Sequence, residues 1–125
     1  MTIRVYYEAW QLECCGDPFQ VGDEVSWRLV ASDLPFDLRE LVGSEVEEPQ
    51  WTEEHHGDGD GVAATRARVI GIQVLVCEHT IDPNTRWAER VPGTGRLIPV
   101  RYANGHDPGD GEFEGHVVDL DPFTP

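Results

Sequence analysis

Six side chains that favour soft metal ions lie in three separate segments of this 125-residue sequence. They are Cys14, Cys15, His55, His56, Cys77 and His79. Thiolate and imidazole are the ligands that Zn²⁺ prefers in a tetrahedral site. Neither Cys-x-x-Cys nor His-x-x-x-His occurs, so a zinc site requires the three segments to meet in the fold. Cys77 and His79 are two apart on one predicted strand, and we expect them to project from the same face.

The simpler interpretation of these residues is that they hold no metal. Cys14 and Cys77 are then small buried apolar residues, Cys15 is partly exposed, and the histidines are solvated in loops. Three cysteines, two of them adjacent, argue against a disulfide framework and fit a reducing compartment. We therefore predict no cofactor and no structural disulfide, with zinc as the alternative.

Catalytic arrangements have little support in the sequence. A cysteine nucleophile needs a nearby base or a helix N-terminus to lower its pKa, and nothing around Cys15 and Gly16 provides either. Neighbouring carboxylates such as Glu53 and Glu54 are expected by chance among 24 acidic residues. The sequence therefore supplies no catalytic residue and favours a protein that is not an enzyme.

Aromatic side chains at positions predicted to face outward are the better candidates for binding. Tyr6 and Trp10 belong to the polar side of the first predicted strand, Trp51 lies in an acidic linker, and Trp87 precedes a predicted hairpin. Exposed aromatic residues often mark contact surfaces. Trp10 and Trp51 could equally cover the open ends of a small barrel, and the periodicity leaves both interpretations open.

The elements that must position these residues are mostly strands. Residues 2–8 alternate, with Ile3, Val5 and Tyr7 on one face. In residues 24–29 the apolar face is Val25, Trp27 and Leu29. Residues 32–43 read as one short helix, with an early aspartate, a proline in the first turn and a glycine at the end.

The second half of the chain predicts further strands. Residues 44–64 form an acidic and then glycine-rich loop, and residues 65–81 form one long strand that bends at Gly71. Residues 87–91 and 97–102 are predicted to pair as a hairpin, and residues 116–120 form the last strand. We expect one mainly β domain over residues 1–125: a small antiparallel barrel of five or six strands, SH3-like or OB-like, with one short helix.

One block resembles a known family. Residues 10–27 read Trp-Gln-x-Glu-Cys-Cys-Gly-x-Pro-Phe-x-Val-Gly-Asp-x-Val-x-Trp, which is similar to the opening of a family of small actinobacterial proteins of unknown function. Residues 53–57 and 115–121 resemble further landmarks of that family. The resemblance implies an actinobacterial cytoplasmic protein, and it carries over no activity and no catalytic residue.

Net charge excludes several classes of partner. The chain carries 24 acidic and nine basic residues, a net charge of −15, which repels nucleic acid backbones and anionic membranes. The first residues lack the apolar segment of a signal peptide, so we expect a cytoplasmic location. The leading hypothesis is a non-enzymatic module that binds a basic protein partner. The alternatives are a zinc protein or metalloenzyme built on the cysteine and histidine segments, and an acidic mimic of nucleic acid.

Overall fold

The computed structural model describes residues 2–32, 34–54, 63–105 and 112–123, and of these it leaves the side chains of residues 15 and 112 undescribed. Ten strands and two helices lie within the described residues. They are β1 (Ile3–Glu8), α1 (Ala9–Cys15), β2 (Phe19–Gln20), β3 (Glu24–Ala31), α2 (Leu38–Val42), β4 (Trp51–Glu53), β5 (Ala64–Cys77), β6 (His79–Ile81), β7 (Ala88–Arg90), β8 (Arg96–Val100), β9 (Tyr102–Ala103) and β10 (Glu112–Pro122). Among the described residues, no helix has the length and apolar character needed to cross a membrane.

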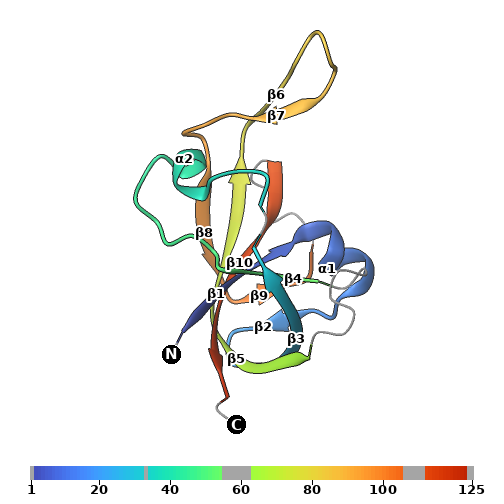
Figure 1. The fold of residues 1–125 in the computed structure, drawn as a ribbon, viewed down its shortest axis with the longest axis vertical. Helices are drawn as coiled ribbons and strands as arrows, with labels where there is room; N and C mark the ends of the chain where they lie inside the picture. Colours follow the sequence, from blue (N-terminus) through green and yellow to red (C-terminus); the bar gives the residue numbers. More distant parts are fainter. Residues whose placement is uncertain (1, 33, 55–62, 106–111, 124–125) are drawn as a thin grey trace.

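Five strands close into a barrel (Figure 1). β10 pairs with β1, β1 with β4, β4 with β3, β3 with β5, and β5 returns to β10. β8 adds to β5 as an extra strand. The prediction of a mainly β chain with a small five- or six-stranded barrel is confirmed. One pairing differs from the antiparallel expectation, because β1 and β4 run parallel.

Strand β5 is long enough to pair with three other strands. Its first part pairs with β3, its second part with β8, and its other edge with β10. Opposite β10, Gly71 pairs with Asp119 and Val69 with Leu120, so Ile70 is an extra residue in a bulge. The bulge places the bend beside Gly71, where the sequence predicts it, and it leaves the side chain of Ile70 exposed.

Two hydrophobic clusters lie on opposite faces of the barrel wall. Tyr6 and Tyr7 of β1 belong to different clusters, as adjacent residues of a strand must. The inner cluster comprises Val5, Tyr7, Leu12, Phe19, Trp27, Leu29, Ala67, Val69, Ile72, Ala103, Val118 and Leu120. The outer cluster comprises Tyr6, Leu38, Leu41, Leu75, Cys77 and Val117. The predicted core face of β3 is confirmed, since Trp27 and Leu29 are buried.

The expectation that Tyr6 lies on an exposed face of β1 is wrong. Its side chain is only 2% exposed, because Leu38 and Leu41 of α2 cover the outer face of the barrel at this point. The rings of Tyr6 and Phe36 pack edge to face with centroids 5.8 Å apart. Alternation identifies the two faces of a strand, and it does not reveal that a distant helix covers the second one.

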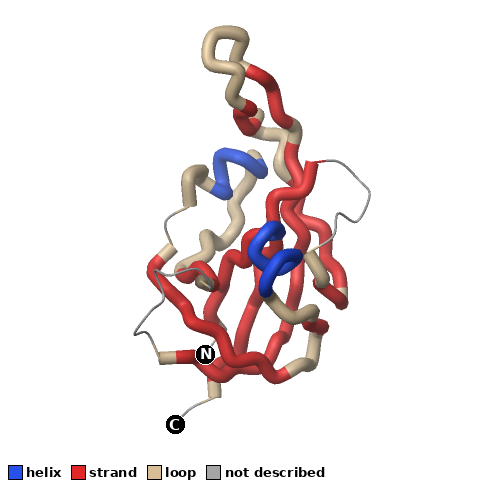
Figure 2. Tube along the Cα trace, turned by 90° about the vertical axis from the view of Figure 1, so that its right-hand side faces the viewer, coloured by secondary structure: helices blue, strands red, loops and turns tan. Residues whose placement is uncertain are grey.

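Helix α1 is absent from the sequence prediction, which expects one helix. It follows β1 directly and lies against the barrel wall (Figure 2). Its seven residues bury Gln11 and Leu12, and two turns are too few to produce a recognisable helical period.

Helix α2 begins later than the predicted segment. Asp37 caps it by accepting a hydrogen bond from the backbone N–H of Glu40, at 3.2 Å, and Gly43 ends it with φ at 78°.

The predicted hairpin across residues 92–95 does not form. β7 instead pairs back with β6, and β8 pairs with β5. The N–H groups of Gly93 and Gly95 donate to the carbonyls of Glu40 and Leu41 near the end of α2, so this connection holds the helix in place. The β6–β7 hairpin projects from one end of the molecule (Figure 1).

The acidic segment around residues 44–64 is only partly a loop. β4 lies within it and completes the barrel between β1 and β3. Glu53 is buried in this strand, and its carboxylate is hydrogen-bonded to the hydroxyl of Tyr7. Burial, and then this carboxylate, raise the pKa of the Tyr7 hydroxyl. The remainder of the predicted loop, residues 55–62, lies outside the described residues.

Candidate functional site

Cys77, His79 and Glu114 form a cluster at the base of the β6–β7 hairpin. Their nearest ligand atoms all lie within 4.8 Å of one another. Cys77 Sγ is 3.9 Å from His79 Nε2 and 3.7 Å from Glu114 Oε1, and His79 Nε2 is 2.5 Å from Glu114 Oε1. The sequence predicts the proximity of Cys77 and His79, and the structure adds Glu114.

Local backbone geometry places the three side chains. Cys77 is the last residue of β5 and His79 is the first residue of β6, which belongs to a different sheet. The prediction of one strand over residues 65–81 is therefore wrong at Glu78, and the two side chains lie on either side of this break. In β10, Phe113 pairs with Val76 and Gly115 with Leu75, which leaves Glu114 as the extra residue of a bulge. A bulge redirects a side chain out of the regular alternation, and here the Glu114 carboxylate lies beside Cys77 and His79.

The carboxylate of Glu114 is shared between this cluster and Arg90. Arg90 Nη2 donates to Glu114 Oε2 at 3.0 Å, while Oε1 lies beside His79. The guanidinium carbon of Arg90 lies 4.7 Å from the centre of the Phe36 ring, a cation–π distance. Arg90 Nε is buried without a hydrogen-bond partner among the described residues.

The cluster does not have the geometry of a nucleophilic triad. In such a triad the nucleophile and the acid contact opposite ring nitrogens of the histidine, whereas Cys77 and Glu114 both approach His79 Nε2. Burial, and then the negative charge of Glu114, raise the pKa of the Cys77 thiol to about 11. Cys77 is therefore a protonated thiol at neutral pH.

We predict that Cys77 reacts slowly with iodoacetamide. A thiol with an ordinary pKa near 8.5 has roughly three hundred times more thiolate at pH 7.5 than one with a pKa of about 11. The expected alkylation rate, measured by mass spectrometry of the peptide containing Cys77, is at least tenfold below that of the same peptide free in solution. Equal rates in the folded protein and the peptide would contradict the protonated, buried thiol.

The other predicted metal ligands do not join this cluster among the described residues. Cys14, in α1, is disulfide-bonded while Cys77 is a free thiol, so the expectation of no disulfide is wrong. An odd number of cysteines leaves one thiol unpaired, and it does not exclude a single bond. Cys15 is the last residue of α1, and His55 and His56 lie outside the described residues.

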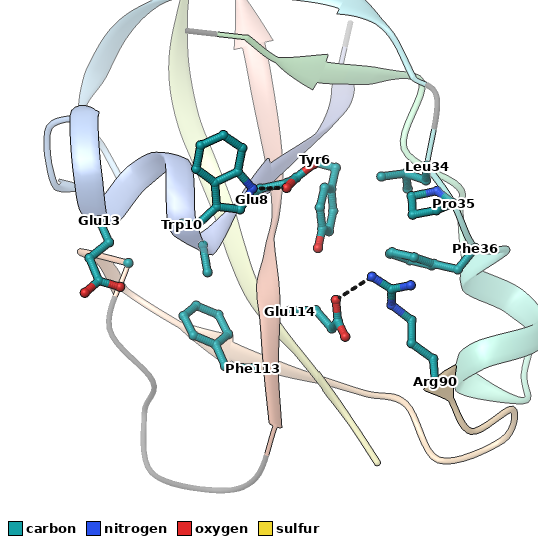
Figure 3. A pocket seen from close by; sticks show the side chains of 12 residues that line it. Tyr6, Glu8, Trp10, Glu13, Leu34, Pro35, Phe36, Arg90, Phe113 and Glu114 are labelled. Atoms are coloured by element: carbon teal, nitrogen blue, oxygen red, sulfur yellow. Dashed lines mark hydrogen bonds and ion pairs between the residues drawn. The ribbon is translucent and has the colours of Figure 1, made fainter. Parts of the chain in front are cut away.

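A pocket of about 460 Å³ lies beside the cluster and shares Glu114 with it (Figure 3). We call it the aromatic pocket. Its lining consists of aromatic, acidic and small apolar residues and one arginine. They are Tyr6, Glu8, Ala9, Trp10, Glu13, Leu34, Pro35, Phe36, Arg90, Gly105, Phe113 and Glu114.

Segments far apart in the sequence supply the walls of the aromatic pocket. The end of β1 and the start of α1 provide Glu8 and Trp10, and Glu8 accepts a hydrogen bond from the indole N–H of Trp10. Residues 34–36, before α2, face them across the pocket, while Phe113 of β10 completes the wall (Figure 3). Trp10 is 54% exposed, so a large part of its indole remains available to a ligand.

The four predicted binding aromatics separate into different regions. Tyr6 and Trp10 both line the aromatic pocket. Trp51, in β4, is not part of the lining, and neither is Trp87, which lies next to β7 on the projecting hairpin and is 74% exposed. The sequence prediction missed Glu8, Phe36, Phe113, Arg90 and Glu114, because a pocket wall assembled from separate segments has no local sequence pattern.

Comparisons with known proteins give a family and no activity. Neither the curated proteins nor the solved structures include a match to this chain. A family model matches residues 1–122, which is nearly the whole chain. The chain belongs to DUF6578, a family of unknown function.

Proposed function

We propose that the protein is a non-enzymatic binding module whose aromatic pocket takes an arginine side chain of a basic protein partner. The single observation that carries this proposal is the composition of the pocket: aromatic rings beside the carboxylates of Glu8, Glu13 and Glu114. Rings attract a guanidinium through their faces, and carboxylates accept its N–H groups in pairs. The net charge of −15 favours the same class of partner.

The fold already holds one guanidinium by this chemistry. Arg90 lies over Phe36 at 4.7 Å and donates to Glu114 at 3.0 Å. On the other side of the pocket, the exposed indole of Trp10 and the carboxylates of Glu8 and Glu13 offer the same pair of partners. We propose that the partner's arginine occupies this second position.

Arginine fits the proposed position better than lysine. The guanidinium is planar, so it stacks on the indole of Trp10 while its edge reaches the carboxylates, and it is more weakly hydrated than an ammonium group. The negative charge of the whole chain would also raise the rate of encounter with a basic partner. A cytoplasmic setting and the absence of direct nucleic acid and membrane binding remain predictions from the sequence.

The test is the binding of a fluorescein-labelled nona-arginine peptide, measured by anisotropy at low ionic strength. We expect Trp10→Ala to weaken binding about tenfold or more, because a central tryptophan in an interface is often a hot spot. Glu8→Gln should weaken it about threefold. The matched controls are Trp51→Ala and Glu45→Gln, whose residues lie outside the pocket lining, and both should bind within a factor of two of wild type.

The dependence of binding on salt and on peptide composition tests two further parts of the proposal. Binding should weaken as salt is raised, since the Debye length falls to about 10 Å at 0.1 M, and nona-lysine should bind less tightly than nona-arginine. Equal losses in Trp10→Ala and Trp51→Ala would show that nonspecific charge attraction accounts for the binding. That result, or no binding of nona-arginine at low salt, would overturn the proposal.

A further inference from the structure

We propose that Cys77, His79 and Glu114 bind one zinc-class divalent ion, with the fourth coordination position open to water. The ion would displace the proton that the Cys77 thiol holds at neutral pH and release it to solvent. The three residues then supply a thiolate, an imidazole and a carboxylate, which are the ligand types of zinc sites. Their ligand atoms lie within 4.8 Å of one another. The proposal is independent of the arginine pocket, although Glu114 contributes to both.

The distances are close to those of a tetrahedral site. Zinc–ligand bonds of about 2.0 to 2.3 Å at tetrahedral angles place sulfur about 3.5 Å from nitrogen or oxygen, and nitrogen about 3.3 Å from oxygen. The two distances from Cys77 Sγ are 3.9 and 3.7 Å, so the sulfur needs to move by only a few tenths of an ångström. His79 Nε2 and Glu114 Oε1 are 2.5 Å apart, and the ion would replace this hydrogen bond and separate the two atoms.

The surroundings suit a half-buried site. Cys77 is 4% exposed, while the side chains of His79 and Glu114 are 20% and 11% exposed, so one side of the cluster is open to solvent and an ion can enter. Arg90 donates to Glu114 Oε2, which leaves Oε1 for the ion and fixes the carboxylate in a one-oxygen mode. Such support of a ligand by an outer residue is common in metal sites.

The positive charge of Arg90 opposes the ion, and only three side chains bind it. We therefore expect an affinity in the micromolar range, weaker than that of closed four-ligand sites. The three ligands come from the end of β5, the start of β6 and the bulge of β10. The bound ion would join the base of the β6–β7 hairpin to the barrel and so restrict the motion of the hairpin.

The test is a titration of tag-free, chelator-treated protein with Co²⁺ under argon without added reductant, which keeps the disulfide of Cys14 intact, followed by absorption spectroscopy. We expect one equivalent to give a thiolate-to-cobalt charge-transfer band with the visible bands of a tetrahedral ion, and Zn²⁺ to displace it. Cys77→Ser should abolish the charge-transfer band. His79→Gln and Glu114→Gln should each weaken cobalt binding at least tenfold, because each removes one of three ligands.

Two matched controls identify the site. Glu78→Gln removes an exposed carboxylate between Cys77 and His79, and Cys14→Ser removes a cysteine outside the cluster; both should keep the wild-type spectrum and affinity. Loss of the band in Cys14→Ser with retention in Cys77→Ser would place any metal elsewhere and overturn the proposal. Absence of a thiolate band at millimolar Co²⁺ in wild type would also overturn it.

Folding and function are separated by two further measurements. Melting curves without metal show whether each variant is folded, and any variant that unfolds is replaced by Cys77→Ala, His79→Ala or Glu114→Ala at the same position. Saturating Zn²⁺ should raise the melting temperature of wild type by roughly 5 °C and slow amide exchange in β6 and β7. Trp10→Ala should bind Co²⁺ normally, so a failure of arginine binding does not imply a failure of the metal site.

Discussion

Acidification from pH 7 to pH 4 is expected to lower the free energy of unfolding by about 3 kcal/mol through His116 alone. His116 is 1% exposed in β10, and burial lowers the pKa of its imidazole to about 4 in the folded protein. A hydrogen bond to the Tyr7 backbone acts in the opposite direction and is the smaller effect. Nδ1 has no hydrogen-bond partner among the described residues, so a proton there would be buried without an acceptor.

The sign follows from the two pKa values. The unfolded chain takes up the proton near pH 6.5, while the folded protein resists it until about pH 4. Between these values the unfolded state binds more protons, so stability falls as pH falls. Well above pH 6.5 the imidazole is neutral in both states, and its full contribution to stability is present.

Urea unfolding of wild type and His116→Phe at pH 7, 5.5 and 4 measures this contribution. Phenylalanine keeps an aromatic ring beside Phe113 and Phe19, whose centroids are 5.2 and 6.3 Å from that of His116, and it does not titrate. The variant should lose about 3 kcal/mol less than wild type between pH 7 and pH 4. His116→Gln provides a second non-titrating variant. Identical pH profiles in wild type and both variants would contradict the assignment to His116.

The barrel could be predicted from the sequence because its inner face follows strict alternation. Val5 and Tyr7 in β1, and Trp27 and Leu29 in β3, all belong to the inner cluster, and each lies two residues from the next on its strand. This pattern depends only on local geometry. It therefore identifies β1 and β3 correctly, and it leaves their partners undetermined, as the parallel pairing of β1 with β4 shows.

The parts that could not be predicted depend on contacts between distant segments. Tyr6 is buried because α2 covers it, and His116 is buried because its strand lies in the middle of the sheet between β1 and β5. The bulge that brings Glu114 to Cys77 and His79 arises from the pairing of β10 with β5. Cys77 and His79, two residues apart, were the only part of this cluster that sequence spacing could bring together.

The same principle applies to Gly105, whose importance arises from a helix nearly a hundred residues earlier in the chain. Gly105 has φ at 84°, a conformation that side-chain-bearing residues rarely adopt. A Cβ atom there would lie 2.6 Å from the backbone nitrogen of Glu13 and 2.9 Å from its Cα. Because these are backbone atoms of α1, the contact can be relieved only by moving the helix.

Gly105→Ala is therefore expected to lower the free energy of unfolding by about 3 kcal/mol or more. The left-handed conformation costs about 1 to 2 kcal/mol in alanine, and the forced displacement of a packed element adds about 1 to 3 kcal/mol. The matched control is Gly22→Ala, because Gly22 has φ at 99° and no atom within 4 Å of the added Cβ. This control should lose only the conformational contribution.

Urea unfolding of the two variants separates the cost of the contact with Glu13 from the cost of the left-handed backbone. Peptide binding then tests whether displacement of α1 also disturbs the aromatic pocket. Gly105 lines the aromatic pocket together with Trp10 and Glu13 of α1. A displaced helix should weaken nona-arginine binding in Gly105→Ala, while Gly22→Ala should bind as wild type does. If the two variants lost the same free energy of unfolding, the displacement of α1 at Glu13 would cost no free energy. The helix would then not hold Trp10 rigidly, and the pocket would lack the fixed wall on which stacking of a guanidinium depends.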